Sequence, residues 1–237
     1  MVIMGRKIGW VDGKDNIAIV RYNSTGEIIP IEGIAMANNL KINGGLYVLS
    51  PINGSLYAKN AEIGGPLEME KAKITGMVYI PNAKIGESLY ARDAEIGALV
   101  DADNIKISEG LIIANAKIGS LHMENAKIDG WVNAEGAKIN GHMIYKNAEV
   151  NGEMNVKNAK IRGWLDISDA KIPELITSRN TKFEGINLAG TEIEKFKGEL
   201  PKINDLLYAI NENTELPDSL TKQLPHYEEV YEGALRV

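Results

Sequence analysis

The sequence contains no cysteine among its 237 residues. Disulfide frameworks and thiolate metal sites are therefore excluded, and stability must come from packing and hydrogen bonds. Long apolar runs are also missing, because no stretch approaches the roughly 18 apolar residues of a membrane span. The first residues lack the apolar segment of a secretory signal. These absences predict a cytoplasmic protein with no membrane partner.

Positive charge is in deficit, with a net charge of -6 at pH 7. This balance argues against a general nucleic-acid binder, although a local basic stripe is compatible with it. Glutamine is nearly absent, and Gln223 is the single example. Together with the many Lys, Glu and Ile residues, this resembles thermophile composition, although the many Asn residues argue against it.

Motifs for catalysis are missing as well. The sequence has no G-x-x-x-x-G-K-[ST], H-E-x-x-H or G-x-S-x-G pattern. Enzymatic β-helices build their clefts from long loops, but between residues 61 and 180 no repeat is longer than eleven residues. We therefore expect no enzymatic activity, no catalytic residue and no cofactor.

A phrase of eleven residues recurs throughout the middle of the chain. Ala83-Lys84-Ile85-Gly86 returns as Ala94-Glu95-Ile96-Gly97, and one later step has ten residues instead of eleven. A β-branched residue follows two positions after each first residue. The first positions are Ala61, Ala72, Ala83, Ala94, Ile105, Ala116, Ala126, Ala137, Ala148, Ala159 and Ala170.

The unit reads Ala-Lys/Glu-Ile-x-Gly-x-Leu-x-φ-x-Asn, where φ is usually apolar. Positions 1, 3, 7 and 9 are apolar or small and alternate with polar positions, which is typical of strands with one buried face. A right-handed helical supercoil also has an eleven-residue period. Glycine disfavours it, because each Gly costs a helix interior about 1 kcal/mol. Gly and Asn instead indicate two bends per unit.

One unit per coil is too tight a ring to bury Ile and Leu, whereas two units leave room for a filled core. We therefore predict an all-β fold, a single parallel β-helix with two eleven-residue units per coil. With rungs about 4.8 Å apart, some seven coils would form the rod. Corner positions would carry amide or carboxylate side chains with a structural role. These are Asn60, Asn82, Asp93, Asn104, Asn115, Asn125, Asn147, Asn158, Asp169 and Asn180.

The Asn-Ala-Lys-Ile-x-Gly-x-Leu phrasing resembles the right-handed quadrilateral β-helices of pentapeptide-repeat proteins, and also the bactofilins. The likeness covers about residues 29–193. It implies a right-handed coil and, from the bactofilins, polymerisation into filaments. A strict five-residue rhythm is absent, and the eleven-residue step is shorter than the usual bactofilin period.

The ends differ from the repeat, which predicts three segments: an N-terminal β cap at 1–28, the β-helix at 29–193 and a helical C-terminal cap at 194–237. The N-terminal segment reads as an antiparallel meander. In the C-terminal segment Ile203, Leu206, Leu207 and Ile210 fall on one helical face. Further helical turns are expected at residues 217–219 and after Pro225. This cap could be a lid over the last coil or a helical oligomerisation tag.

Three surface features are candidate sites. His122 and His142 on adjacent coils could share a metal ion with Asp101 as third ligand, although both fit ordinary surface histidines. An apolar strip on the same face could bind a protein partner or a second copy. The alternative is that these are ordinary scattered apolar residues of a protein surface. The strip comprises Met77, Tyr79, Leu99, His142, Ile144 and Trp164.

Lysine at position 2 is the third feature. The stacked lysines could bind nucleic acid or an acidic glycan, or they could be a solvated face that prevents strand pairing. The first hypothesis is thus a non-enzymatic structural or interaction β-solenoid that self-assembles or binds a protein partner. The second is a glycan or polyanion binding module that uses the Lys and aromatic ladders. The third hypothesis is a glycan-active enzyme, but the sequence lacks the long loops that would form a cleft.

Overall fold

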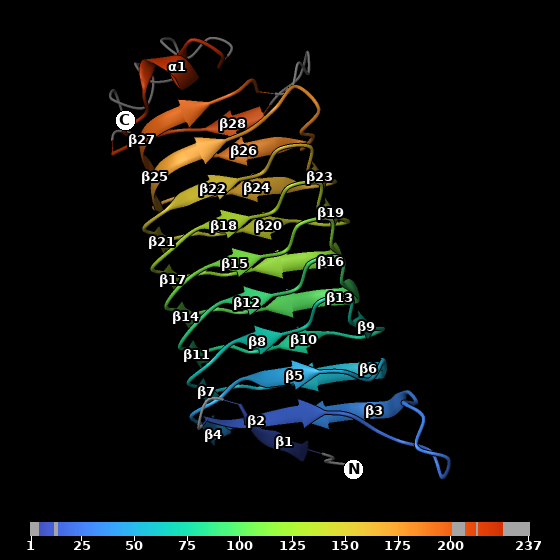
Figure 1. Cartoon of the computed structure of the whole chain (residues 1–237). Helices are drawn as coiled ribbons and strands as arrows, with labels where there is room; N and C mark the ends of the chain where they lie inside the picture. Colours follow the sequence, from blue (N-terminus) through green and yellow to red (C-terminus); the bar gives the residue numbers. More distant parts are fainter. Residues whose placement is uncertain (1–4, 12–13, 201–206, 212, 225–237) are drawn as a thin grey trace.

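The computed structural model describes residues 5–11, 14–200, 207–211 and 213–224. Across these ranges the chain winds into a parallel β-solenoid of about 8 turns, with one short helix at its C-terminal end (Figure 1). The predicted fold class is confirmed. The handedness of the coil stays a prediction from the resemblance.

Each coil has four sides, so every eleven-residue unit supplies two short strands. One coil consists of β7 (Glu62–Ile63), β8 (Leu67–Glu68), β9 (Lys73–Ile74) and β10 (Val78–Tyr79). The next coil begins at β11, where Lys84 lies directly over Glu62. The 22-residue offset confirms the prediction of two units per coil.

The strands stack into four columns, which we call sides 1 to 4 (Figure 1). Side 1 contains β4 (Lys41–Ile42), β7, β11 (Lys84–Ile85), β14 (Lys106–Ile107), β17 (Lys127–Ile128) and β21 (Glu149–Val150). Side 2 contains β2 (Lys14–Ile19), β5 (Leu46–Val48), β8, β12 (Leu89–Tyr90), β15 (Leu111–Ile112), β18 (Val132–Asn133) and β22 (Glu153–Asn155). Sides 1 and 2 share β25 (Lys171–Ile176) and β27 (Glu192–Lys197).

Side 3 contains β9, β19 (Lys138–Ile139) and β23 (Lys160–Ile161). Side 4 contains β10, β20 (Met143–Ile144), β24 (Trp164–Asp166), β26 (Gly185–Asn187) and β28 (Leu207–Ala209). Sides 3 and 4 share β3 (Ile31–Met36), β6 (Ile52–Tyr57), β13 (Glu95–Asp101) and β16 (Lys117–His122).

The core runs the length of the solenoid as continuous columns of buried side chains. Ile85 stacks on Ile63 and Ile107, and Leu89 stacks between Leu67 and Leu111. All six are nearly inaccessible to solvent. The polar residues between them point outward, as the alternation predicts. Like side chains one above another pack closely in the interior, and only a small space of about 10 Å³ is left among Met69, Leu89 and Leu111.

Asparagine at the corner positions has the left-handed backbone that the bends require. Asn82 has φ = 57° and Asn104 has φ = 58°, while Gly136 occupies an equivalent corner at φ = 68°. The side chains also form ladders: Asn60 Nδ2 donates to Asn39 Oδ1 at 3.1 Å and Asn147 Nδ2 donates to Asn125 Oδ1 at 2.7 Å. Short polar side chains tolerate this conformation because they can bond locally.

Asn180 lies in a turn at the predicted corner, but unlike the other predicted corner residues it is not left-handed. The following unit begins with Thr181 in place of Ala. The Thr181 hydroxyl donates to the Val156 carbonyl at 3.0 Å and accepts the Ser178 backbone N–H at 3.1 Å. This side-chain network holds the bend in a different backbone conformation.

Glycine at position 4 is required for a different reason from the one that the sequence suggested. The backbone of Gly86 is not left-handed. A Cβ atom there would fall on the carbonyl oxygen of Gly64 in the coil below, and the same holds for Gly97 over Thr75. Gly therefore permits close approach of successive backbones.

On side 2 a hairpin covers the N-terminal end of the stack. Strand β1 (Gly5–Val11) pairs antiparallel with β2, and β2 pairs parallel with β5. The second strand of the predicted meander is therefore already part of the stack. An antiparallel bridge between Tyr22 and Ile28 closes the loop that follows.

The C-terminal end corrects the prediction of a helix over residues 203–210. Leu207–Ala209 form β28, which pairs parallel with β26, and stacking thus continues past residue 193. Residues 201–206 lie outside the described residues, as does the helix expected after Pro225. An unpaired last strand leaves backbone groups open, and β28 satisfies those of β26 better than a local helix could.

The predicted turn near residue 217 is confirmed as α1 (Asp218–Thr221). Leu220 and Leu224 are buried against the end of the core. Ser219 Oγ donates to the Phe196 carbonyl at 3.3 Å, which ties the helix to β27. The described part of this segment therefore lies as a lid over the last coil.

Candidate functional site

Side 4 carries the predicted apolar strip. All six residues lie on its strands or next to them, and Tyr79, Asp101, His122 and Ile144 occupy one column at successive rungs. Asp101 and His122 are polar, so the apolar surface is divided in the middle. Met77 and Tyr79 lie below this division, Leu99 lies on the same rung as Asp101, and Ile144 and Trp164 lie above it.

The structure extends the lower group by three residues that the sequence analysis did not include. Ile34 and Met36 are 49% and 38% exposed, and they stack below Ser55 and Tyr57. Ile34 and Met36 precede residues of the predicted strip by two steps of 21 to 22 residues. This spacing in the sequence could have identified them. We call the combined surface the apolar patch: Ile34, Met36, Tyr57, Met77, Tyr79 and Leu99.

Side chains of the apolar patch contact one another across coils. The rings of Tyr57 and Tyr79 lie 5.5 Å apart in a tilted arrangement. The Tyr57 hydroxyl donates to Met77 Sδ at 3.4 Å. These contacts fix aromatic and thioether groups side by side on a flat β-sheet face, where a partner can pack against them.

The upper group is used within the fold. His142 Nδ1 accepts the backbone N–H of Trp164 at 3.0 Å. A Cβ atom at Gly185 would meet the indole of Trp164, so this ring covers the Gly185 backbone. His142 and Trp164 therefore stabilise the stacking of side 4, and neither is free to act as an isolated surface group.

The structure separates the candidate metal ligands. Asp101 and His122 are neighbours in one column, but His142 lies in another column and its Nδ1 is already an acceptor. Burial raises the pKa of the Asp101 carboxyl, and a hydrogen bond from the Asp103 backbone opposes this shift. Within the described ranges no group of three His, Asp or Glu side chains could hold a metal ion.

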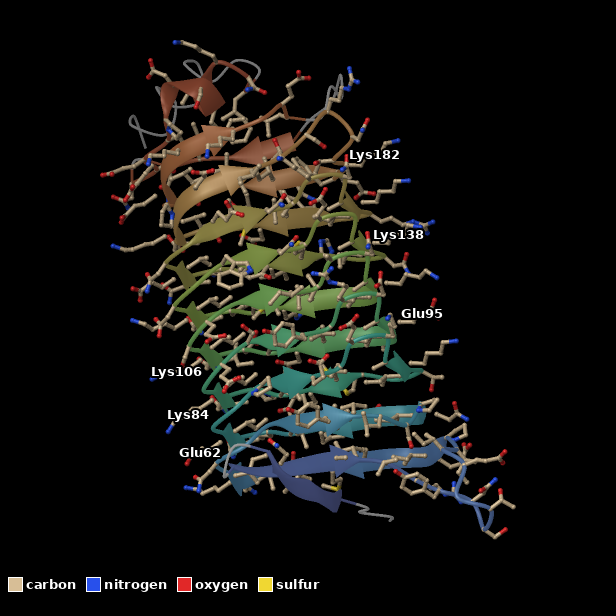
Figure 2. All side chains as sticks on the ribbon, in the orientation of Figure 1. Glu62, Lys84, Glu95, Lys106, Lys138 and Lys182 are labelled. Atoms are coloured by element: carbon tan, nitrogen blue, oxygen red, sulfur yellow. The ribbon has the colours of Figure 1, made fainter. Side chains whose placement is uncertain are left out.

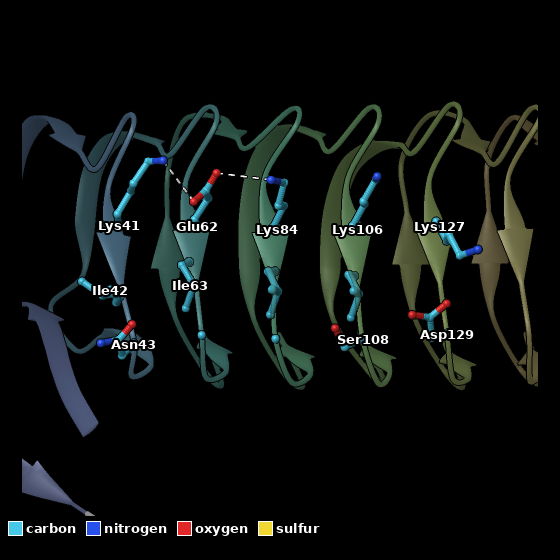
Figure 3. Close-up of a pocket in the computed structure, with 14 residues that line it drawn as sticks. Lys41, Ile42, Asn43, Glu62, Ile63, Lys84, Lys106, Ser108, Lys127 and Asp129 are labelled. Carbon is cyan, nitrogen blue, oxygen red and sulfur yellow. Dashed lines mark hydrogen bonds and ion pairs between the residues drawn. The ribbon is translucent and has the colours of Figure 1, made fainter. Parts of the chain in front are cut away.

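Side 1 carries a shallow trough of about 800 Å³ that runs along the solenoid axis (Figure 3). The backbones of Gly64 and Gly86 form part of its floor. Lysine and glutamate side chains at position 2 make one wall, and Asn43, Ser108 and Asp129 lie opposite. The lack of side chains at the two glycines is what hollows the sheet surface.

Three of the four lysines on this wall form ion pairs with glutamates. Glu62 accepts from Lys41 and from Lys84 at 3.2 Å each. These two lysines lower the pKa of the Glu62 carboxyl, with the hydrogen bond from Lys41 as the largest cause. Farther along, Lys127 pairs with Glu149 at 3.3 Å. An ionised, paired carboxylate such as Glu62 is poorly suited to act as a general acid at neutral pH.

Side 3 carries a second charged row on the opposite edge of the solenoid (Figure 2). Glu95 pairs with Lys117 at 2.6 Å, and this hydrogen bond lowers the pKa of the Glu95 carboxyl. Above Lys117 the row continues with three lysines and no acid: Lys138, Lys160 and Lys182. The predicted lysine stacking is thus confirmed, divided between two edges.

Among the described residues, no helix is long and apolar enough to cross a membrane. Comparison with family models, with curated proteins and with solved structures found no match. The resemblance to pentapeptide-repeat proteins and bactofilins is therefore supported only at the level of a parallel β-solenoid.

Proposed function

We propose that the protein is a non-enzymatic structural scaffold that pairs with a second copy of itself through the apolar patch on side 4. The observation that carries this proposal is the exposure of Ile34 and Met36 directly beside the stacked Tyr57 and Tyr79. Tyr and Met are enriched in protein interfaces, and charged residues are depleted at their centres.

The form of the patch favours an identical copy as the partner. A two-fold axis perpendicular to side 4 would place the patch of one copy on the patch of the other. Because both faces are flat and share one rung spacing, the side chains of Tyr57 and Tyr79 could interdigitate with the same rows in the second copy.

The ends of the solenoid are less suited to assembly. At the C-terminal end Leu220 and Leu224 cover the core near β27, and at the N-terminal end β1 covers β2. Covered rungs offer fewer unpaired backbone groups for end-to-end stacking. Lateral pairing is therefore preferred here to the filament formation that the bactofilin resemblance implies.

Analytical ultracentrifugation over a range of concentrations tests the proposal. We expect the unmodified chain to dimerise and the double variant Ile34→Lys/Met36→Lys to be monomeric at the same concentrations. The control is Ile28→Lys/Leu49→Lys, which changes two other exposed apolar residues, 49% and 44% accessible, outside the patch.

The control variant should dimerise like the parent chain. A parent chain that stays monomeric at every concentration would contradict self-pairing, and equal loss of dimers in both variants would contradict the assignment to the patch. Circular dichroism melting of each variant checks that the solenoid remains folded.

A further inference from the structure

The lysines in the upper half of side 3 form a row of uncompensated positive charge. Lys138, Lys160 and Lys182 pair in register at successive rungs, and all three are exposed. Arg162 is exposed two residues beyond Lys160. None of these four has an ion pair with another described residue. We call these four residues the basic row.

Side 1 carries a similar run of lysines, but acidic residues pair with both of its ends. Lys84, Lys106 and Lys127 stack at successive rungs there, but Glu62 pairs with Lys84 and Glu149 pairs with Lys127. Like charges directly opposite each other in a sheet destabilise it. Acids thus relieve the repulsion at both ends of the run on side 1, whereas Lys138, Lys160 and Lys182 have no ion pair with another described residue.

The spacing of the row fits a linear ligand. Neighbouring rungs are about 4.8 Å apart, which is close to the rise of one sugar residue in an extended polysaccharide. Successive lysines could therefore meet carboxylates on successive sugars. Asn140, exposed two residues beyond Lys138 on the same rung, adds an amide that can bond to sugar hydroxyls.

The composition of the surface favours a glycan over a nucleic acid. Single-stranded nucleic acids are bound by basic grooves with aromatic platforms on which bases stack. The outward positions 2 and 4 beside the row are Lys138, Asn140, Lys160, Arg162, Lys182 and Glu184. None of these is aromatic, so recognition would rest on charge and hydroxyl contacts alone.

We propose that the basic row binds an acidic linear polysaccharide with a carboxylate on successive sugars. The ligand would lie along the solenoid axis, on the edge opposite the trough of side 1. This site is separate from the apolar patch, which lies on side 4, so binding and self-pairing can be tested independently.

Binding of fluorescent polygalacturonate to the full chain, measured by anisotropy at low and high salt, tests the proposal. We expect binding at low salt that weakens as salt rises. The triple variant Lys138→Gln/Lys160→Gln/Lys182→Gln should bind roughly tenfold or more weakly, with a shallower salt dependence. Neutral dextran should not bind either protein.

The matched control is Lys84→Gln/Lys106→Gln/Lys127→Gln, which removes three charges at the same repeat position on side 1. It should retain the affinity of the parent chain. Equal weakening in both triple variants would overturn the assignment to the row, because net charge would then explain binding. No binding by the parent chain at low salt, or tighter binding of a single-stranded oligonucleotide than of polygalacturonate, would overturn the ligand class.

Discussion

Glu62 lies between Lys41 and Lys84 on three successive rungs, and each of its carboxylate oxygens accepts from one lysine at 3.2 Å. One acid thus compensates two bases and links three coils. The lysines hold the pKa of Glu62 below its ordinary value in the folded chain. In the unfolded chain these contacts are lost and the pKa returns to about 4.3.

This relationship predicts how stability depends on pH. Because the folded pKa is lowered, the stabilisation by ionised Glu62 is present above the unfolded pKa and is lost as pH falls through the folded pKa. The Glu62→Gln variant should therefore be less stable than the parent chain at pH 7, and the difference should shrink below about pH 4.3. Urea unfolding at a series of pH values measures both curves.

The control for this experiment is Glu135→Gln, because Glu135 has no ion pair with another described residue. Its stability should follow that of the parent chain at each pH. A difference between parent and Glu62→Gln that stayed constant into the acid range would show that the ion pairs are not its source.

Lys160 in the basic row offers the reverse experiment. Lys160→Glu would reproduce the arrangement of Lys41, Glu62 and Lys84 between Lys138 and Lys182. Exposed ion pairs contribute a few tenths of a kcal/mol each, so we expect a gain of about 0.5 kcal/mol in the free energy of unfolding. Thermal melting at low and high salt measures it.

Added salt should raise the melting temperature of the parent chain relative to that of Lys160→Glu. Salt screens the repulsion between lysines in the parent chain, and it screens the attraction between the introduced glutamate and the lysines in the variant. Lys160→Gln removes the repulsion without adding attraction and should fall between the two. A variant Lys160→Glu less stable than Lys160→Gln would refute the electrostatic account of the row.

Asn82 tests the corner ladder. Its backbone is left-handed at φ = 57°, and its side chain donates to Asn60 Oδ1 at 3.3 Å. Asn82→Ala should lower the free energy of unfolding by about 1 kcal/mol, because a Cβ without a local hydrogen bond is unfavourable in this conformation. Asn82→Gly should lie closer to the parent chain, as Gly136 occupies an equivalent corner. Chemical denaturation ranks the stabilities of the parent chain and the two variants. If Asn82→Ala were more stable than Asn82→Gly, the left-handed backbone would not be the source of the loss.

Tyr145 is a fully buried side chain in the core, and its hydroxyl has no hydrogen-bond partner among the described residues. Burial raises the pKa of this hydroxyl, so it stays protonated. An unsatisfied buried hydroxyl costs roughly 1–3 kcal/mol. Tyr145→Phe should therefore stabilise the chain by about 1 kcal/mol. Tyr90→Phe, at a half-buried position, should change the melting temperature little, and destabilisation by Tyr145→Phe would reveal a partner for the hydroxyl.

The repeat made most of the fold predictable, because burial at positions 1, 3 and 7 depends only on local alternation. Ile85 and Leu89 could be placed in the core from spacing alone, and the offset of two units per coil followed from the space that Ile and Leu need. The left-handed corners were predictable for the same reason, since Asn82 and its equivalents occupy one position in every unit.

Features that depend on neighbouring coils were not predictable. Leu207 belongs to a helical pattern in the sequence, yet the open edge of β26 recruits it into a strand. Asn180 lies at its predicted corner, but it lacks the left-handed backbone of the other corners, and the Thr181 side chain bonds across this bend. The apolar strip was divided because Asp101 and His122 interrupt its column, and Ile34 joined it only through stacking below Ser55.

The offset of two units per coil has a consequence for how such a chain can change length. Deleting 22 residues, such as those from Ala83 to Asn104, would shorten the solenoid by one coil. Every later side chain would stay on the side that it occupies now. Deleting only one eleven-residue unit would instead rotate everything above it by half a turn. Lys138, Lys160 and Lys182 would then stand over Lys84, and the apolar patch would lose its alignment with Trp164. Duplication or loss of two units together is thus the route by which a gene could lengthen or shorten this protein while each side keeps its own residues.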